Sequence, residues 1–298
     1  AERIQTDHAM KESVKKIVVF TGAGVSADSG LSTFRDADGL WDKYRIEDVC
    51  TPEALARNRE KVVEFYNIRR RELLGCSPNA GHEAIRRLED HFDVDVITQN
   101  IDDLHERAGS SRVLHLHGEL RKLRSSIDES LIVPIDGWEQ KPDQRAPDGS
   151  LLRPFVVFFG EGVPMFDRAA RIAATADLMI VVGTSLAVYP AASLVRYIRP
   201  EVPVFLVDPG LPDTSGIRNP VEHIRAGAAQ GGQQASVDVD AAQGRHVQHR
   251  LRQQLAIGHH GHQLRAQRPQ RLRRLDGPEA FGLEHRDAPR QRQLLPGN

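Results

Sequence analysis

An apolar run near the start of the chain ends directly in a glycine-rich turn. Residues 16–24 read KIVVFTGAG, and no charged residue interrupts the run between Lys16 and the turn. Such a run is typical of a strand that is buried on both faces, as the strands of a parallel sheet are. The glycine pair Gly22 and Gly24 then predicts a turn whose backbone approaches a phosphate group. A tight strand-to-helix turn would need the same glycines.

Runs of the same kind recur along the chain, with segments of helical spacing between them. We expect further strands within 94–100, 112–118, 155–161, 177–185 and 202–208. We expect helices within 52–58, 60–74, 79–91, 101–109, 165–176 and 191–198. Thr51 is the expected cap of the first of these helices, and Pro52 its first residue. Alternating strands and helices predict an α/β fold with a doubly wound parallel sheet.

The composition is that of a globular chain with a substantial core. Of 298 residues, 40% are hydrophobic, and 40 Lys and Arg nearly balance 41 Asp and Glu. The net charge of -1 predicts no general attraction to nucleic acid or to an anionic membrane. Two cysteines, Cys50 and Cys76, exclude a disulfide framework and suggest a reducing compartment. No apolar run reaches the roughly 18–20 residues that span a bilayer, so we expect a cytoplasmic protein.

Composition divides the chain into three parts. Residues 1–15 form a polar arm, 16–231 carry the strand and helix pattern, and 232–298 form a tail rich in Arg, Gln and His. From residue 235 onward the tail has 11 arginines, no lysine and six acidic residues. Its few aliphatic side chains bury too little surface to offset the entropy of ordering, so we predict disorder. A nucleic-acid contact through the arginines and a shifted reading frame are the alternatives.

One stretch inside the domain breaks the alternation of strands and helices. Residues 119–153 are polar and contain three prolines, which predicts an inserted module made of loops. The apolar side chains available for its core are Leu131, Ile132, Val133 and Trp138.

Polar segments follow three of the expected strands. They are Thr98-Gln99-Asn100-Ile101-Asp102, His115-Leu116-His117-Gly118 and Gly183-Thr184-Ser185. Ligands of open parallel sheets bind at the carboxyl ends of the strands. The amides and the carboxylate of the first segment suit an amide-bearing ring and a ribose, and the hydroxyls of the third suit a phosphate or a ribose. Capping of the strand ends would explain any one of these segments taken alone.

The two histidines lie two residues apart, so they share one face of the expected strand. A metal site would need a third ligand, and none lies nearby at a suitable spacing. A general base is the better interpretation of His117, because it precedes a glycine at a strand end. A buried histidine with satisfied hydrogen bonds is the better interpretation of His115.

Five motifs together resemble those of the sirtuins, the NAD-dependent protein-lysine deacylases. They are GAGVSADSGLSTFRD, TQNIDDLHERAG, HLHGEL, FFGEGVP and GTSLAVYPA, in family order and near family spacing between residues 16 and 231. The resemblance implies a Rossmann-like NAD domain with a small inserted module, NAD as cofactor, and acyl-lysine proteins as partners. It also implies that the products are free lysine, nicotinamide and O-acyl-ADP-ribose.

The resemblance assigns roles to individual residues. His117 would be the general base, with Asn100 and Asp102 beside it in the catalytic site. NAD would be bound by Gly22, Ala23, Gly24, Phe34, Arg35, Gln99, Asn100, Asp102, Gly183, Thr184, Ser185, Asp208, Gly227 and Ala229. The FFGEGVP segment would pair with an extended substrate peptide by strand addition.

Tyr66 and Arg69 are three residues apart and so lie on one face of the expected helix. Sirtuins that prefer succinyl- or malonyl-lysine carry Tyr-x-x-Arg at this place, and an arginine with a phenol suits the carboxylate of such an acyl chain. The alternative is an exposed basic face, because Arg70 and Arg71 follow.

The chain departs from the sirtuin pattern in its inserted module. Most sirtuins hold a structural zinc there with four cysteines, whereas 119–153 contains none, and Ser125 and Ser126 lie near the first expected pair. The sequence therefore predicts no zinc. A protein mono-ADP-ribosyltransferase and an impaired NAD- or ADP-ribose-binding module are the alternative functions.

Overall fold

The computed structural model describes residues 14–31 and 43–231. Most of the polar arm, the tail 232–298, and the expected NAD-binding residues Phe34 and Arg35 lie outside these ranges. The predictions made for those segments therefore stay predictions. Within the described ranges, no helix is long and apolar enough to cross a membrane.

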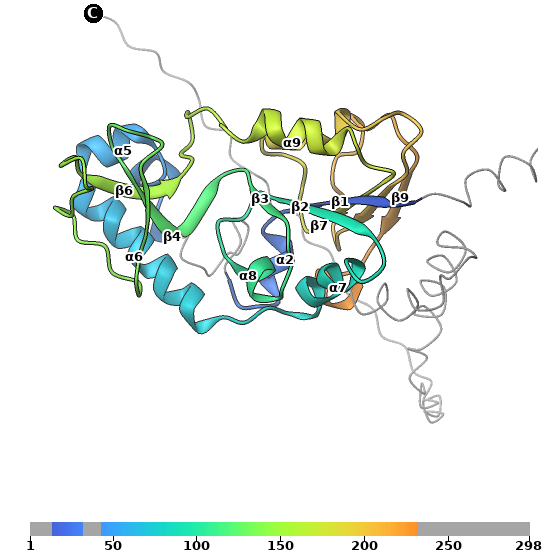
Figure 1. The fold of residues 1–298 in the computed structure, drawn as a ribbon, viewed down its shortest axis with the longest axis horizontal. Coiled ribbons are helices and arrows are strands. Elements are labelled where there is room, and N and C mark those ends of the chain that lie inside the picture. The colour runs from blue at the N-terminus through green and yellow to red at the C-terminus, as the bar shows by residue number, and fades with distance from the viewer. Residues whose placement is uncertain (1–13, 32–42, 232–298) are drawn as a thin grey trace, which may run out of the picture. The chain divides into compact units, whose positions relative to one another are not determined.

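A sheet of six parallel strands forms the centre of the fold (Figure 1). The strands are β1 (Lys16–Thr21), β2 (Asp93–Thr98), β3 (Val113–His115), β7 (Leu178–Val182), β8 (Val204–Val207) and β9 (Val221–Ile224). Their order is β3-β2-β1-β7-β8-β9, so the chain builds outward from β1 in both directions. This confirms the predicted doubly wound sheet, and it places the point where the strand order reverses beside β1.

Helices cover both faces of this sheet. They are α2 (Gly24–Ala27), α7 (Ala80–Leu88), α8 (Leu104–Arg107), α9 (Phe166–Ala173) and a 3₁₀ helix, η1 (Ala191–Arg196). Figure 1 shows α9 on one side of the strands and α2, α7 and α8 on the other. Alternate residues of β1 serve the two cores: Val18 and Phe20 pack with α9 and η1, while Ile17 and Val19 pack with α2 and α7.

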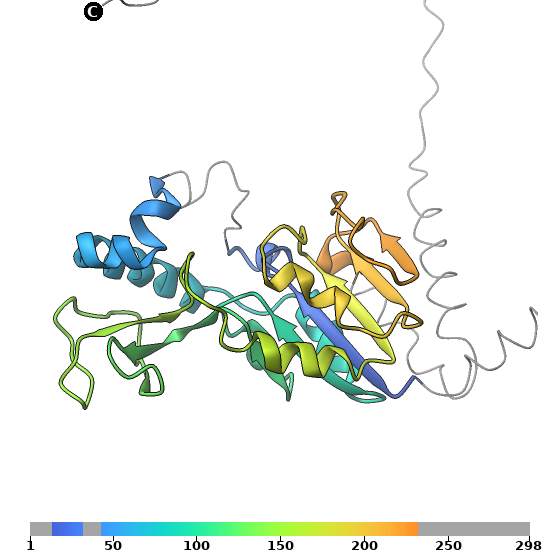
Figure 2. The same ribbon diagram turned by 90° about the horizontal axis from the view of Figure 1, so that it is seen from above.

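A second, antiparallel sheet forms a small module with three more helices. Its strands are β4 (Gly118–Ser125), β5 (Ile132–Pro134) and β6 (Leu152–Val156), in the order β5-β4-β6. The helices are α4 (Ile46–Val49), α5 (Pro52–Arg57) and α6 (Arg59–Gly75). Figures 1 and 2 show α6 beside β4 and β6, and α5 packs against α4 and α6. The expected cap is present, because the Thr51 hydroxyl accepts a hydrogen bond from the Ala54 amide at 3.1 Å.

Three expectations for this part of the chain were wrong. Residues 119–153 are not a set of loops, because β4 pairs with both β5 and β6. The strand expected within 155–161 instead ends at Val156, because Phe158 donates its amide to the Glu161 carboxylate in a turn. The buried core of the sheet consists of Leu123, Ile135, Ala146 and Leu152, with Leu131 and Val133 partly buried at its edge. The expected core residue Ile132 is exposed.

The buried side chain of Arg70 joins helix α6 to strand β4 of this sheet. The alternative interpretation of this segment as an exposed basic face is wrong for Arg70, whose side chain is fully buried. Its Nε donates to the Leu120 carbonyl and its Nη1 to Asn67 Oδ1, both at 2.8 Å. Arg71 is exposed and lies over the Trp138 ring, 3.9 Å from the ring centroid. The arginine run therefore contains one buried residue that bonds the sheet, Arg70, and one surface residue, Arg71.

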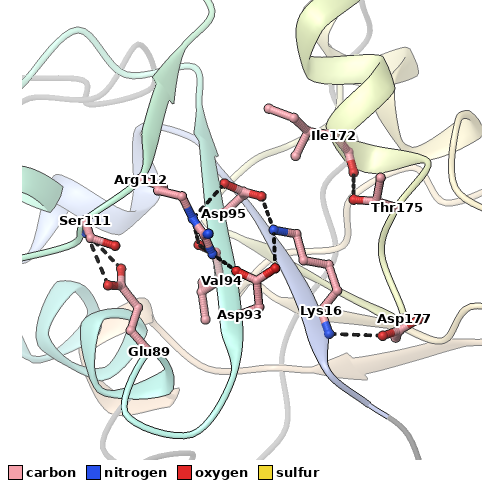
Figure 3. Close-up of polar contacts among 10 residues, drawn as sticks. All are labelled: Lys16, Glu89, Asp93, Val94, Asp95, Ser111, Arg112, Ile172, Thr175 and Asp177. Carbon is pink, nitrogen blue, oxygen red and sulfur yellow. Dashed lines mark hydrogen bonds and ion pairs between the residues drawn. The ribbon is translucent and has the colours of Figure 1, made fainter.

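Charged side chains tie the strands together at the amino edge of the main sheet (Figure 3). Lys16 Nζ lies 2.9 Å from the Asp93 carboxylate and also contacts Asp95. Arg112, the residue before β3, pairs with the same two carboxylates. Asp177 accepts the Lys16 amide at 3.0 Å. This cluster lies opposite the carboxyl ends of the strands, where ligands of such sheets bind.

Candidate active site

Two glycine-containing turns touch where β1 and β7 end. The Gly22 amide donates to the Val182 carbonyl at 3.1 Å, and the Gly24 amide donates to the Gly183 carbonyl at 2.8 Å. A Cβ on Gly24 would lie 2.7 Å from Gly183 Cα, and Gly183 has a φ of 62°. The sequence assigned Gly22 and Gly24 to the approach of a phosphate. The structure shows that they also allow the two turns to pack closely.

A buried chain of hydrogen bonds runs from this turn to the segment that follows β2. Asn100 Nδ2 donates to Ser26 Oγ at 3.1 Å, and Ser26 Oγ donates to Asp102 Oδ2 at 3.0 Å. Leu104 donates its amide to the other Asp102 oxygen at 3.1 Å. Burial raises the pKa of Asp102, while the bonds from Leu104 and Ser26 oppose that rise. Ser26 therefore joins the side chains of Asn100 and Asp102.

Ser26 is a site residue that the sequence reasoning did not single out. It lies within the quoted GAGVSADSG motif, on the first turn of α2. Its position directly after the glycine turn, within this motif, is the signal that the sequence offered. The structure shows that Ser26 is buried together with Val25. Its hydroxyl also lies 3.4 Å from Nε2 of the buried His82. Ser26 thus orients both polar side chains of the β2 segment.

Gln99 connects the ends of β1 and β7. The backbone N–H of Gln99 donates to the Thr21 carbonyl at 2.9 Å, and the side-chain Nε2 donates to Thr184 Oγ1 at 2.9 Å. Thr184 Oγ1 also accepts the Leu186 amide at 3.2 Å. The first and third polar segments of the sequence therefore meet across β1. Ser185 follows Thr184 and is half-buried.

His117 lies in the connection between β3 and β4, so it does not belong to the expected strand. Its Nδ1 lies 3.0 Å from the Gln99 carbonyl. Since a carbonyl oxygen only accepts, Nδ1 carries the hydrogen and the neutral ring keeps its lone pair on Nε2. Burial lowers the pKa of His117, and the bond to Gln99 partly opposes that change. The ring is thus neutral at pH 7, as a general base must be.

His115 ends β3 and is buried, as the interpretation of a satisfied core histidine predicted. Its Nδ1 lies 2.8 Å from the Asn100 carbonyl, and its Nε2 lies 2.8 Å from Glu106 Oε1. No three His, Cys, Asp or Glu residues of the described ranges are grouped so that they could hold a metal ion. The two histidines instead bind the carbonyls of consecutive residues, Gln99 and Asn100.

The remaining expected NAD-binding residues lie toward β8 and the end of the described chain. Asp208 is buried after β8, and its Oδ1 accepts the Gly210 amide at 2.8 Å. Ala229 donates its amide to Asp28 Oδ2 at 3.3 Å. Gly227 also lies near the Asp28 carboxylate. The segment that contains Gly227 and Ala229 is therefore anchored at the end of α2, beside the glycine turn.

Tyr66 is buried in an apolar cluster that also contains Phe158 and reaches Ile101. Its ring stacks on Phe158 with the centroids 5.8 Å apart, and its hydroxyl donates to Cys50 Sγ at 3.5 Å. Burial raises the pKa of Tyr66 well above its usual value, and the nearby Arg69 charge works against that rise. Arg69 is half-buried, so the predicted pair combines a buried phenol with a half-buried cation.

The converging groups fit NAD. The two glycine turns meet beside β1, where the strand order reverses and open α/β sheets bind nucleotides. Buried amide, carboxylate and hydroxyl groups lie next to these turns, on Asn100, Asp102 and Ser26. A dinucleotide requires the same combination of closely approaching backbone and polar side chains.

Comparison with known proteins supports this interpretation. The family model described as the Sir2 family matches residues 22–190, which is more than half of the chain. An NAD-dependent protein deacylase of Bacteroides thetaiotaomicron is 50% identical over 224 residues, which are 73% of this chain and 95% of that protein. A deacylase of Aggregatibacter actinomycetemcomitans is 52% identical over 192 residues, 64% of this chain and 92% of that protein.

Solved structures agree with the sequence comparison. A Sir2 homologue in complex with NAD is 36% identical with a TM-score of 0.66, over 86% of this chain and 95% of its own. A Sir2 protein with a deacetylated p53 peptide and 3′-O-acetyl ADP-ribose is 28% identical with a TM-score of 0.64, over 77% of this chain and 96% of its own. The resemblance read from the five motifs is confirmed, and the chain belongs to the Sir2, or sirtuin, family.

Proposed function

We propose that this chain removes acyl groups from protein lysines in a reaction that consumes NAD. The observation that carries the proposal is the chain of hydrogen bonds through Asn100, Ser26 and Asp102, with the neutral His117 held on the neighbouring Gln99 carbonyl. The deacylase names of the relatives and the NAD-bound homologue support the same activity.

NAD supplies a ribose carbon from which nicotinamide can leave. Gln99, Asn100 and Asp102 would hold the ribose and carboxamide of that end. The diphosphate and adenosine would contact the set Gly22, Ala23, Gly24, Gly183, Thr184, Ser185, Asp208, Gly227 and Ala229, with Phe34 and Arg35. The segment after β6 would pair with the substrate peptide, and a peptide bound to a solved Sir2 protein supports this.

His117 would take a proton from a ribose hydroxyl. The Gln99 carbonyl keeps the hydrogen on Nδ1, so Nε2 is the atom that accepts the proton. The bond from Nδ1–H to the carbonyl persists in the charged ring and stabilises it. His117 therefore needs no carboxylate partner in order to act as a base.

Release of nicotinamide from NAD tests the proposal. We expect release to depend on an acyl-lysine peptide and His117→Ala to slow it by about 10²- to 10⁴-fold while NAD binding is retained. His91→Ala, on the exposed end that follows α7, is the matched control. Label transfer from NAD to protein would indicate an ADP-ribosyltransferase. Binding of NAD without any release would indicate a binding module.

We also propose that the preferred acyl groups include succinyl and malonyl. An acyl carboxylate that enters an apolar cluster loses water, and a nearby cation offsets that loss. Arg69 is close enough to lower the pKa of both Tyr66 and Cys50 by its charge, against the larger effect of their burial. Arg69 follows Tyr66 by three residues on α6, so the two side chains share a face of the helix. Tyr66 lies in the apolar cluster that reaches Ile101, beside Asn100.

Arg69→Met tests this selectivity. Loss of a charge-assisted bond of about 1.5–3 kcal/mol should slow succinyl-lysine turnover roughly 10- to 150-fold and leave acetyl-lysine turnover nearly unchanged. Arg71→Met is the control, because Arg71 is exposed. Arg70 cannot serve as a control, because it is buried in the module. Equal losses with both substrates would assign Arg69 to folding or to general peptide binding.

A further inference from the structure

We propose that His115 and Glu106 form a charged pair that positions Asn100 for NAD, and that NAD affinity falls at alkaline pH when this pair loses its proton. The inference rests on the proposed function, because it concerns the residue assigned to the nicotinamide end of NAD. Neither residue reacts with NAD, so both act as positioning residues through the Asn100 backbone.

The geometry fixes the number of protons on the His115 ring. Nδ1 lies 2.8 Å from the Asn100 carbonyl oxygen, and Nε2 lies 2.8 Å from Glu106 Oε1. A carbonyl oxygen only accepts hydrogen bonds, and so does an ionised carboxylate. Both nitrogens must therefore carry a hydrogen, which makes the ring an imidazolium. A neutral ring has one hydrogen for two acceptors, so one of the two bonds is lost.

The surroundings favour the charged ring. The titratable groups that act on it are Glu106 and His105 of α8, Asp102 before that helix, and Glu119 of β4, to which Lys122 is bound at 2.7 Å. Burial lowers the pKa of His115, but the Glu106 bond and charge, the Asn100 carbonyl and the Glu119 charge together raise it above its usual value. His105 stays neutral, because burial lowers its pKa well below the usual range.

The pair is one of three ties that hold Asn100. The Asn100 amide donates to Thr98 Oγ1 at 3.0 Å, its side chain donates to Ser26, and its carbonyl accepts from His115. When the His115 ring loses a proton, one hydrogen remains for two acceptors. The charge-assisted bond from Nε2–H to the Glu106 carboxylate is the stronger of the two, so the bond from Nδ1 to the Asn100 carbonyl is the one that is lost. This loss loosens the backbone of a residue that would hold NAD. The hydrogen bond of His117 to the Gln99 carbonyl does not involve His115 and is retained.

The affinity of the full-length protein for NAD, measured by titration calorimetry from pH 6 to 9.5, tests this inference without any turnover. We expect the dissociation constant to rise about 2- to 10-fold on the alkaline side, the amount that one net hydrogen bond is worth. In Glu106→Gln the alkaline rise should shrink or disappear, because the glutamine amide can donate to Nε2 of a neutral ring, which then keeps its Nδ1–H bond to the Asn100 carbonyl. Glu83→Gln, on exposed α7 surface, is the control and should match the wild type.

A second readout follows the ring itself. The ¹⁵N signals of His115, assigned by their loss in His115→Gln, should report two ring protons at pH 7 and a lower pKa in Glu106→Gln. An identical pH dependence of NAD affinity in Glu106→Gln and wild type, or a singly protonated His115 at pH 7, would overturn the inference alone. A wild-type protein that binds no NAD at any pH would overturn the proposed function as well.

Discussion

Replacing Arg70 by methionine is expected to destabilise the protein strongly, although the sequence places Arg70 in a run of three arginines. The guanidinium is fully buried and bonds the Leu120 carbonyl and Asn67 Oδ1, both at 2.8 Å. The backbone amide of Gln140 donates to the same Asn67 oxygen at 2.9 Å. Burial lowers the pKa of Arg70 to about 10, so the side chain is charged at neutral pH.

The size of the effect follows from these bonds. Hydrogen bonds to charged groups contribute about 1.5–3 kcal/mol each. Their loss takes the Arg70 donor from the buried Leu120 carbonyl, while Asn67 Oδ1 keeps only the bond from Gln140. Methionine recovers about 1 kcal/mol through apolar contacts, so the net loss in free energy of unfolding is about 2–5 kcal/mol. For a domain of about 200 residues, this lowers the melting temperature by roughly 4–20 °C.

Thermal unfolding of three variants measures this effect. Arg70→Lys keeps the charge but replaces a planar fork by a single ammonium, so its melting temperature should fall between those of wild type and Arg70→Met. Arg71→Met loses only the contact over the Trp138 ring, worth about 0.5–1 kcal/mol at an exposed site. Equal shifts for Arg70→Met and Arg71→Met would refute the assignment of Arg70 as the buried tie between α6 and β4.

Three further outcomes are expected. Burial lowers the pKa of His82 to about 4 and that of His105 well below its usual value, so both are neutral in the fold. Because only the unfolded chain can protonate these two histidines, the free energy of unfolding should be unaffected above about pH 6.5 and should fall toward pH 4 by about 1.4 kcal/mol per pH unit for each histidine. Denaturant titrations at several pH values would measure this fall. Elemental analysis should find no stoichiometric zinc, and a chelator should leave the melting temperature unchanged. Removal of residues 235–298 should leave NAD affinity unchanged, and a loss of solubility would contradict the predicted disorder.

The central sheet was predictable because its strands are buried on both faces. The run from Ile17 to Phe20 is apolar at every position, and the sheet places each of these residues in a core. Parallel strands end at one edge, so the polar segments that follow β1, β2 and β7 had to meet there. The contact between Gln99 and Thr184 across β1 follows from this rule alone.

The small module was less predictable, because its strands carry long charged side chains. Strand β4 reads GELRKLRS, and only some of its positions are buried, which resembles a polar loop in the sequence. Strand β5 has three residues, too few for a visible pattern. The burial of Arg70 was hidden for a related reason. Its acceptors are backbone and amide oxygens brought by β4 and by the segment around Gln140, which are distant in the sequence.

A hydrogen-bonded cluster surrounds Ser125, one of the two serines that the sequence comparison with the sirtuin pattern placed near the first expected cysteine pair. The Ser125 hydroxyl is fully buried, 2.7 Å from both Asp148 Oδ2 and Ser150 Oγ, and it accepts the Ile127 and Asp128 amides. These residues do not fit zinc, which requires thiolate, imidazole or several carboxylate ligands. They join the end of β4 to the segment that enters β6, and so they link two parts of the module by hydrogen bonds. Together with Arg70, they give the module internal ties that depend on hydrogen bonds, so its stability should respond to serine and arginine substitutions and not to chelation.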